Sequence, residues 1–201
     1  MQPVATYIAS FIDNCGPFDA IIELGCGYGK NLIEIYYGGG PRDIPYIGGE
    51  LTTLCVGMAS RISRLDNNIP TQFFLFDPAK PDISQLPTIR NPLFFTEHSF
   101  DQADCLQPEF FRVIANAAPK VTCLHFEYFG YKASSRDKGM TQHDPFFSVS
   151  PGFIPRVAVA MRQAEIMRII KIDYGPNEVL LSHDPGNPTS LSIWSSISER
   201  D

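Results

Sequence analysis

Apolar and polar positions follow two alternating patterns along the chain. Short apolar runs of strand length are separated by segments in which apolar residues recur every three or four positions, as on one face of a helix. This alternation is typical of an α/β fold, in which helices cover both faces of a mostly parallel sheet. The runs predict seven strands, at residues 19–25, 45–50, 72–77, 92–97, 121–127, 166–173 and 189–194.

Helical spacing is clearest in two of the connecting segments. The apolar residues with this spacing are Leu51, Leu54, Cys55, Met58, Ile62 and Leu65 between the second and third runs, and Phe110, Phe111, Ile114 and Ala117 before the fifth. Both segments are predicted to be crossover helices, because parallel neighbouring strands need such a connection.

The C-terminal part of the chain has a different pattern. Gly, Pro and Asn separate its last two predicted strands, without a helical segment between them, so we expect an antiparallel hairpin that closes the sheet. Residues 128–152 form the longest irregular stretch, and such loops in compact domains are usually functional or disordered. With 201 residues, no repeat and no linker, the chain is expected to form one domain, residues 1–201.

Three glycines follow the first predicted strand at every second position. In the segment "IIELGCGYGKN" these are Gly25, Gly27 and Gly29, preceded by Glu23. A glycine-rich turn between a strand and a helix lies at the carboxyl edge of a parallel sheet, where open α/β folds bind their ligands. The NAD fingerprint GxGxxG would need its third glycine at Lys30, so the spacing ExGxGxG departs from the dinucleotide pattern.

Two acidic residues end the next two predicted strands, Glu50 and Asp77. With the ExGxGxG segment, they make the chain resemble the class I S-adenosylmethionine-dependent methyltransferases. The resemblance implies a Rossmann-like fold, with a seven-stranded mostly parallel sheet and S-adenosyl-L-methionine as cofactor. It also implies that Glu50 bridges the two ribose hydroxyls and that Asp77 binds the adenine amino group.

A narrower resemblance covers roughly residues 19–194. The segments "GGELT", "FDPAKPD", "FFTEHSFDQ", "LHFEYF" and "GNPTSLSIW" are similar, in order, to segments of bacterial sugar O-methyltransferases. The chain departs from them at "PGFIPRVAVAMRQAEI" before the sixth predicted strand. This resemblance implies methyl transfer to a small-molecule hydroxyl, such as that of a sugar. The alternatives are a small-molecule N-methyltransferase, a non-catalytic cofactor-binding module of a larger synthase and an NAD-dependent reductase.

The resemblance also implies which residues form the site. The expected cofactor-binding residues are Glu23, Gly25, Cys26, Gly27, Gly29, Glu50, Leu51, Asp77, Pro78, Thr96, Glu97 and His98.

Two residues are candidates for catalysis. His98 follows the fourth predicted strand, where the fold faces the transferring methyl group, and histidine can accept a proton at neutral pH. It is either the general base or a member of the cofactor pocket. Glu127 ends the fifth predicted strand and could orient acceptor hydroxyls. His125, in the middle of that strand, is more typical of a core histidine.

Net charge and cysteine spacing limit the classes of partner and metal site that we expect. The formal net charge is −6 and no block of basic residues occurs, so we expect a small-molecule acceptor and neither nucleic acid nor a membrane as partner. The five cysteines are widely spaced without a CxxC pair, which argues against disulfides and structural zinc. A site with Glu127, His143 and Asp144 has no metal-ligand spacing, so no metal is predicted. Residues 1–14 lack signal-peptide features, and the protein is expected to be cytoplasmic.

Overall fold

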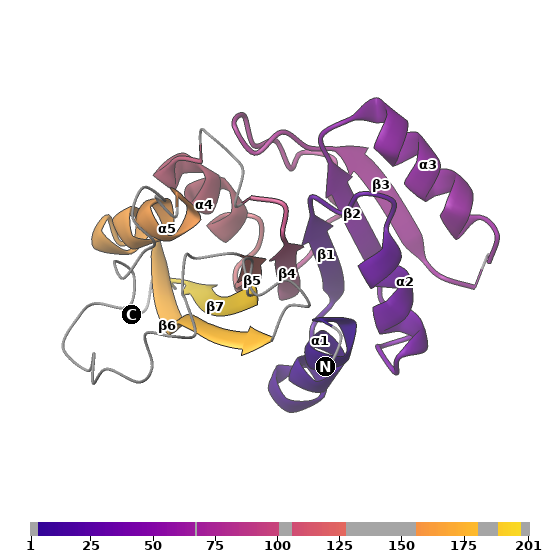
Figure 1. Cartoon of the computed structure of the whole chain (residues 1–201), viewed down its shortest axis with the longest axis horizontal. Coiled ribbons are helices and arrows are strands. Elements are labelled where there is room, and N and C mark those ends of the chain that lie inside the picture. Colours follow the sequence, from indigo (N-terminus) through magenta and orange to yellow (C-terminus); the bar gives the residue numbers. More distant parts are fainter. Residues whose placement is uncertain (1–3, 67, 101–105, 128–155, 181–188, 198–201) are drawn as a thin grey trace.

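The computed structural model describes residues 4–66, 68–100, 106–127, 156–180 and 189–197, with no side-chain description for 176–180. It contains a seven-stranded sheet with the strand order β3-β2-β1-β4-β5-β7-β6 (Figure 1). The strands are β1 (Ala20–Leu24), β2 (Tyr46–Glu50), β3 (Thr71–Leu75), β4 (Pro92–Glu97), β5 (Thr122–Glu127), β6 (Ile170–Leu180) and β7 (Thr189–Ser196).

The strand pairing confirms the predicted α/β class. Strands β1 to β5 pair in parallel, whereas β7 pairs antiparallel with both β5 and β6. The C-terminal hairpin therefore closes the sheet as predicted. Because β1 and β4 lie side by side although β2 and β3 separate them in sequence, the direction of winding reverses between them. Open α/β sheets bind ligands at the carboxyl edge beside such a reversal.

Helices cover both faces of the sheet (Figure 1). They are α1 (Val4–Cys15), α2 (Lys30–Tyr37), α3 (Thr53–Ser63), α4 (Pro108–Ala115) and α5 (Arg156–Ile166). One buried cluster joins α1 and α2 to the sheet, and includes Ile8, Ile35 and Phe95. The other joins α4 and α5 to the opposite face, and includes Phe110 and Trp194. Alternate residues of each strand thus enter different cores, which fixes the face to which each strand-end residue points.

Helix α3 confirms the predicted crossover helix. It begins at a capped end, because the Thr52 side chain accepts a hydrogen bond from the Cys55 N–H at 3.2 Å. Its buried residues are Ala59 and Ser63, whereas the predicted apolar positions Leu54 and Met58 are exposed. The helical spacing is therefore present, but a narrower face of small residues contacts the sheet.

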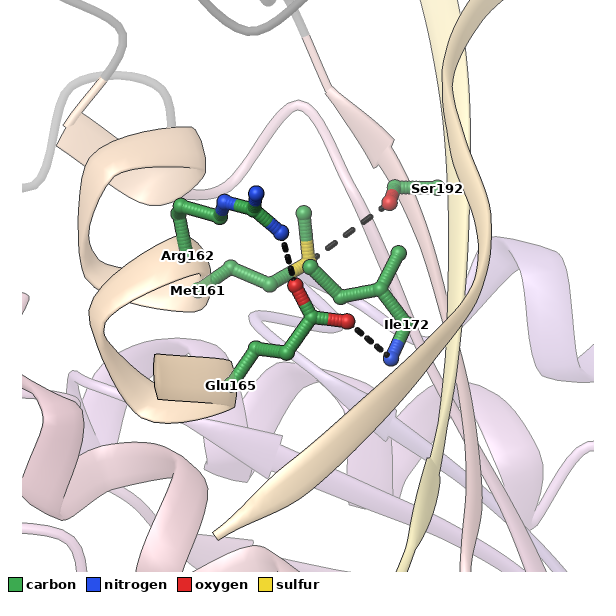
Figure 2. Close-up of polar contacts among 5 residues, drawn as sticks. All are labelled: Met161, Arg162, Glu165, Ile172 and Ser192. Atoms are coloured by element: carbon green, nitrogen blue, oxygen red, sulfur yellow. Dashed lines mark hydrogen bonds and ion pairs between the residues drawn. The ribbon is translucent and has the colours of Figure 1, made fainter. Parts of the chain in front are cut away.

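The prediction for the sixth strand, residues 166–173, was wrong at both ends, because the strand continues to Leu180. The strand begins at Ile170 and not at Ile166, because α5 continues to Ile166 and a turn follows, with Arg168 at a φ of 55°. Figure 2 shows how the two elements are joined. Glu165 on α5 forms an ion pair with Arg162 and accepts the Ile172 N–H at 3.1 Å. That bond occupies a backbone donor on the edge strand β6.

Candidate functional site

A cleft with a volume of about 300 Å³ lies at the carboxyl edge of the sheet. The turns after β1, β2, β3 and β4 form it, because the carboxyl ends of parallel strands meet at one edge. Its lining residues are Gly25, Gly27, Glu50, Leu51, Phe76, Pro78, Glu97, His98, Ser99 and Phe100. The structure therefore brings together many of the predicted site residues, and adds Phe76 and Phe100.

The glycine turn has a backbone that other residues rarely adopt. Gly25, Gly27 and Gly29 have φ angles of 80°, 54° and 81°. A Cβ on Gly25 would lie 2.3 Å from the Cβ of Ser99, so close packing excludes a side chain there. A Cβ on Gly27 would meet nothing within 4 Å, which leaves open space beside that residue in the cleft. Gly29 instead lies against the Phe73 ring and not in the cleft wall.

Glu50 connects the end of β2 to the glycine turn. Its Oε2 accepts a hydrogen bond from the Gly27 N–H at 3.1 Å, and its Oε1 accepts a longer one from the Thr52 N–H at 3.4 Å. Leu51 follows it and is 56% exposed at the cleft. A carboxylate and an apolar side chain therefore stand next to each other opposite the open space at Gly27.

Two further carboxylates meet at a single amide. The Asn31 Nδ2 on α2 donates to Glu23 Oε1 at 2.6 Å and to Glu97 Oε2 at 2.5 Å. Glu23 is 1% exposed and behind the cleft wall, whereas Glu97 lines the cleft. Burial raises the pKa of Glu23 well above its usual value, the Asn31 hydrogen bond lowers it, and the charges of Glu97 and Glu50 raise it further. Sequence reasoning placed Glu23 and Glu97 here but missed Asn31.

The segment after β3 contributes apolar walls. Phe76 and Pro78 line the cleft, while the Asp77 between them does not. The Asp77 Oδ1 accepts the Ala79 N–H at 2.9 Å, which is the hydrogen bond of a turn that starts at an aspartate. Asp77 therefore stabilises this turn beside the cleft. Cys26 is buried beneath the glycine turn, where burial raises the pKa of its thiol.

Glu127 binds the backbone of the segment after β4 without lining the cleft. This carboxylate is fully buried, and it accepts the N–H groups of Ser99 at 3.3 Å and Phe100 at 3.2 Å. The Ser99 hydroxyl donates to it at 3.4 Å and to the Leu24 carbonyl at 3.1 Å. Glu127 does not line the cleft. Its contacts in the described part of the chain are those of a residue that positions the cleft wall.

His98 is the first residue of the segment after β4. It has a φ of 45°, and its N–H donates to the Phe126 carbonyl at 2.9 Å. Its side-chain Nε2 lies 2.7 Å from the Oγ1 of Thr189, the first residue of β7. Thr189 is 91 positions away in sequence and no motif identifies it, so sequence reasoning missed this contact.

His125 is a core histidine, as predicted. The Trp194 indole N–H donates to its Nε2 at 2.9 Å, so the proton of the neutral ring lies on Nδ1, 2.9 Å from the Thr96 hydroxyl. Burial lowers the pKa of His125 to about 3, which keeps the ring neutral. Thr96 is fully buried in this network and does not line the cleft.

Several sequence predictions fall outside the described residues. These are the loop at 128–152, with His143 and Asp144, and the last two residues of the segment "FFTEHSFDQ", Asp101 and Gln102. Among the residues that are described, no group of three or more His, Cys, Asp or Glu side chains could hold a metal ion. None of the described helices has the length and apolar character needed to cross a membrane.

Comparison with known proteins identifies the fold. No protein-family model matches the sequence, and no curated protein sequence matches it. A SAM-dependent methyltransferase from Aquifex aeolicus superposes with a TM-score of 0.62 at 13% identity, over 94% of this chain and 88% of that one. The fold is that of S-adenosylmethionine-dependent methyltransferases. The class expected from the ExGxGxG segment is thus confirmed at the level of the fold.

Two other methyltransferase structures differ in what they act on. The N-terminal domain of EvdMO1, solved with S-adenosylhomocysteine (SAH) and D-fucose, matches with a TM-score of 0.59 at 10% identity, over 98% of this chain and 84% of that domain. The small RNA methyltransferase HEN1 matches with a TM-score of 0.60 at 12% identity, over 97% of this chain. The chain spans 41% of a longer EvdMO1 chain and 25% of HEN1.

Proposed function

We propose that the chain binds S-adenosylmethionine (SAM) in the cleft and transfers its methyl group to a hydroxyl of a small, sugar-like acceptor. The observation that carries the proposal is the meeting of Gly27 and Glu50. Their hydrogen bond of 3.1 Å holds a carboxylate beside a backbone segment with open space where a side chain would stand. A ribose with two neighbouring hydroxyls needs such a carboxylate, and a flexible amino-acid tail needs such an open backbone.

The other cleft residues fit the remaining parts of the cofactor. Leu51, Phe76 and Pro78 supply apolar walls for the adenine ring. Glu97 and Glu23 supply negative charge for the ammonium group of the methionine tail. Glu23 Oε2 is buried and has no hydrogen-bond partner in the described structure, so a ligand cation nearby would compensate it. We assign no cofactor contact to Asp77 Oδ1, which already accepts the Ala79 N–H.

His98 is the proposed general base. When bound, SAM supplies a methyl group on a positively charged sulfur, which an acceptor oxygen attacks in line while the carbon–sulfur bond breaks. His98 would take the hydroxyl proton at a ring nitrogen, and its contact with Thr189 fixes the plane of the ring. Glu127 acts indirectly, because its bonds to Ser99 and Phe100 hold the wall next to His98.

Two features support a small acceptor of the sugar class. The sequence resembles sugar O-methyltransferases, and the EvdMO1 domain with this fold was solved with D-fucose. HEN1 shares the fold and acts on small RNA, yet the present chain carries a net charge of −6. An acidic chain lacks the positive surface that holds a phosphate backbone, so RNA is the less favoured acceptor.

Thermal unfolding with ligands tests the cofactor first. SAH is expected to raise the melting temperature, because a ligand that binds only the native state stabilises it. Reduced NAD serves as the control and is expected to leave the melting temperature unchanged. If reduced NAD stabilised the protein and SAH did not, the assignment would fail in favour of a reductase.

A transfer assay with SAM labelled on its methyl group then tests the acceptor. Label is expected in sugars that carry free hydroxyls and not in amines or RNA. Labelled amines would favour the N-methyltransferase alternative, and labelled RNA would replace the small acceptor. SAH binding without transfer to any member of a broad panel would favour a binding module.

Substituting Gly27 with valine is expected to weaken SAH binding at least about tenfold. The branched side chain would occupy the open space, and a φ of 54° costs a residue with a Cβ about 1 to 2 kcal/mol of stability. Gly39→Val is the matched control, because Gly39 has a φ of 109°, open space around it and no place in the cleft. Titration calorimetry on both folded variants distinguishes the loss of space for the ligand from the effect of backbone strain. Normal binding by Gly27→Val would reduce this glycine to a turn residue.

A further inference from the structure

Asn31 occupies an unusual position between two acidic side chains. A primary amide has two N–H donors, and Asn31 Nδ2 directs one to Glu23 at 2.6 Å and the other to Glu97 at 2.5 Å. Both donors are thus committed to carboxylates from different strands. Because Asn31 lies in the first turn of α2, directly after the glycine turn, the same backbone that forms the cleft wall also places this amide.

Among the described residues, the surroundings of Glu23 contain negative charge and no compensating cation. Glu50 faces it from the end of β2 and Glu97 from β4, whereas the Cys26 thiol in the glycine turn is uncharged, because burial raises its pKa. On α2, Lys30 is paired with Glu34 at the surface. On α1, which covers the same face of the sheet, there is no basic residue, and its carboxylate Asp13 is exposed.

Two ionised carboxylates close together in these buried surroundings destabilise the folded protein. Glu23 is 1% exposed, and its Oε2 has no partner among the described residues. A buried carboxyl group in this situation keeps a proton, because the neutral form avoids both the desolvation and the repulsion between like charges. The pKa of Glu23 is raised well above its usual value, as this geometry requires.

We propose that Asn31 is a positioning residue that holds the Glu23 and Glu97 carboxyl groups at one amide, that Glu23 carries a proton while the cleft is empty, and that the ammonium group of the bound cofactor displaces this proton. The inference rests on the proposed function, since it needs a cationic ligand in the cleft. It makes cofactor binding release a proton from the protein. The group concerned is the Glu23 carboxyl and not a residue that takes part in methyl transfer.

The sign of the resulting pH dependence follows from this exchange. Where Glu23 is protonated in the empty protein, binding must remove a proton, so cofactor affinity rises with pH by up to about tenfold per pH unit. Above the pKa of Glu23 in the empty protein no proton remains to be displaced, and the affinity reaches a plateau. An ammonium site built from ionised carboxylates alone would show neither effect in the neutral range.

Titration calorimetry with SAH as the probe measures the released proton directly. Titrations are run between about pH 5.5 and 8.5, at each pH in two buffers that both buffer at that pH but differ in ionisation enthalpy. The wild-type protein is expected to release up to about one proton per bound SAH at the lower pH values. Glu23→Gln is expected to release none, with an affinity that no longer depends on pH.

Substitutions at Asn31 and at Glu97 are expected to shift the pH dependence of SAH binding in opposite directions. Asn31→Leu removes the donor that stabilises ionised Glu23, so proton release should extend to higher pH and affinity at neutral pH should fall about tenfold or more. Glu97→Gln removes a neighbouring negative charge, so release should end at a lower pH. Glu34→Gln, on the exposed side of α2, is the control and should match the wild type. Glu97→Gln and Glu23→Gln carry the test if Asn31→Leu does not fold.

The outcomes are distinguishable. SAH binding without proton release at any pH would overturn the proton on Glu23 and leave the proposed function standing. Asn31→Leu with wild-type affinity and wild-type proton release would remove Asn31 from the role. Failure of the wild-type protein to bind SAH at all would overturn the proposed function, and the present inference with it.

Discussion

Replacing Glu50 with alanine is expected to weaken SAH binding by about 10² to 10⁴. Under the proposed assignment the carboxylate accepts two ribose hydroxyl bonds. Hydrogen bonds to a charged group contribute about 1.5 to 3 kcal/mol each, and about 1.4 kcal/mol corresponds to a factor of ten in the dissociation constant. No other carboxylate lines the described cleft except Glu97, which is bonded to Asn31, so nothing in place would replace Glu50.

Glu50 also stabilises the glycine turn, and the experiment must distinguish this role from binding of the ribose. Its Oε2 holds the Gly27 N–H at 3.1 Å, so alanine would also release the glycine turn. Glu50→Gln keeps an oxygen acceptor for that N–H but loses the charge, and is expected to bind SAH with intermediate affinity. Titration calorimetry measures both variants, with the melting temperature of the empty proteins as control. An alanine variant within about twofold of the wild type would remove Glu50 from the ribose.

The fold was predictable because its strongest signals are local. Apolar runs fix the strands, and a glycine turn after the first strand needs only neighbouring residues to be recognised. The start of β6 was missed for a related reason. The apolar residues of "IMRII" continue across the end of α5, and a short apolar run does not distinguish the last turn of a helix from a buried strand.

The position of the site was predictable, whereas the task of each residue was less so. Gly25, Glu50 and Glu97 follow parallel strands, and the sheet necessarily brings those strand ends to one edge. Which way a strand-end side chain points depends on packing that the sequence does not display. Asp77 faces its own turn, and Glu127 faces the backbone of the segment after β4.

The residues that sequence reasoning missed are defined by contacts alone. Asn31 is a common residue type in the first turn of a helix, and it becomes informative only when two distant glutamates meet its amide. Thr189 belongs to β7, which the antiparallel hairpin brings next to β5 and so to His98. Neither residue has a spacing or a motif that marks it beforehand.

Replacing His98 with alanine is expected to lower turnover by about 10² to 10⁴ while the dissociation constant for SAH changes less than about twofold. A positioned general base contributes a factor of that size when the attacking group is a hydroxyl. His98 lines the cleft at the end of β4, next to the Ser99 and Phe100 wall. Methyl transfer and calorimetric binding are measured on the same variant.

Thr189 provides the comparison that interprets the His98 result. Thr189→Val removes the hydroxyl that lies 2.7 Å from His98 Nε2 and keeps the shape of the side chain, so turnover should fall less than in His98→Ala, and Thr189→Ser should restore it. If His98→Ala weakens SAH binding together with turnover, His98 belongs to the cofactor pocket. Near-wild-type turnover would exclude both roles. Glu97 would then be the described carboxylate in the cleft wall to test as the base, since Glu127 already accepts two backbone N–H groups.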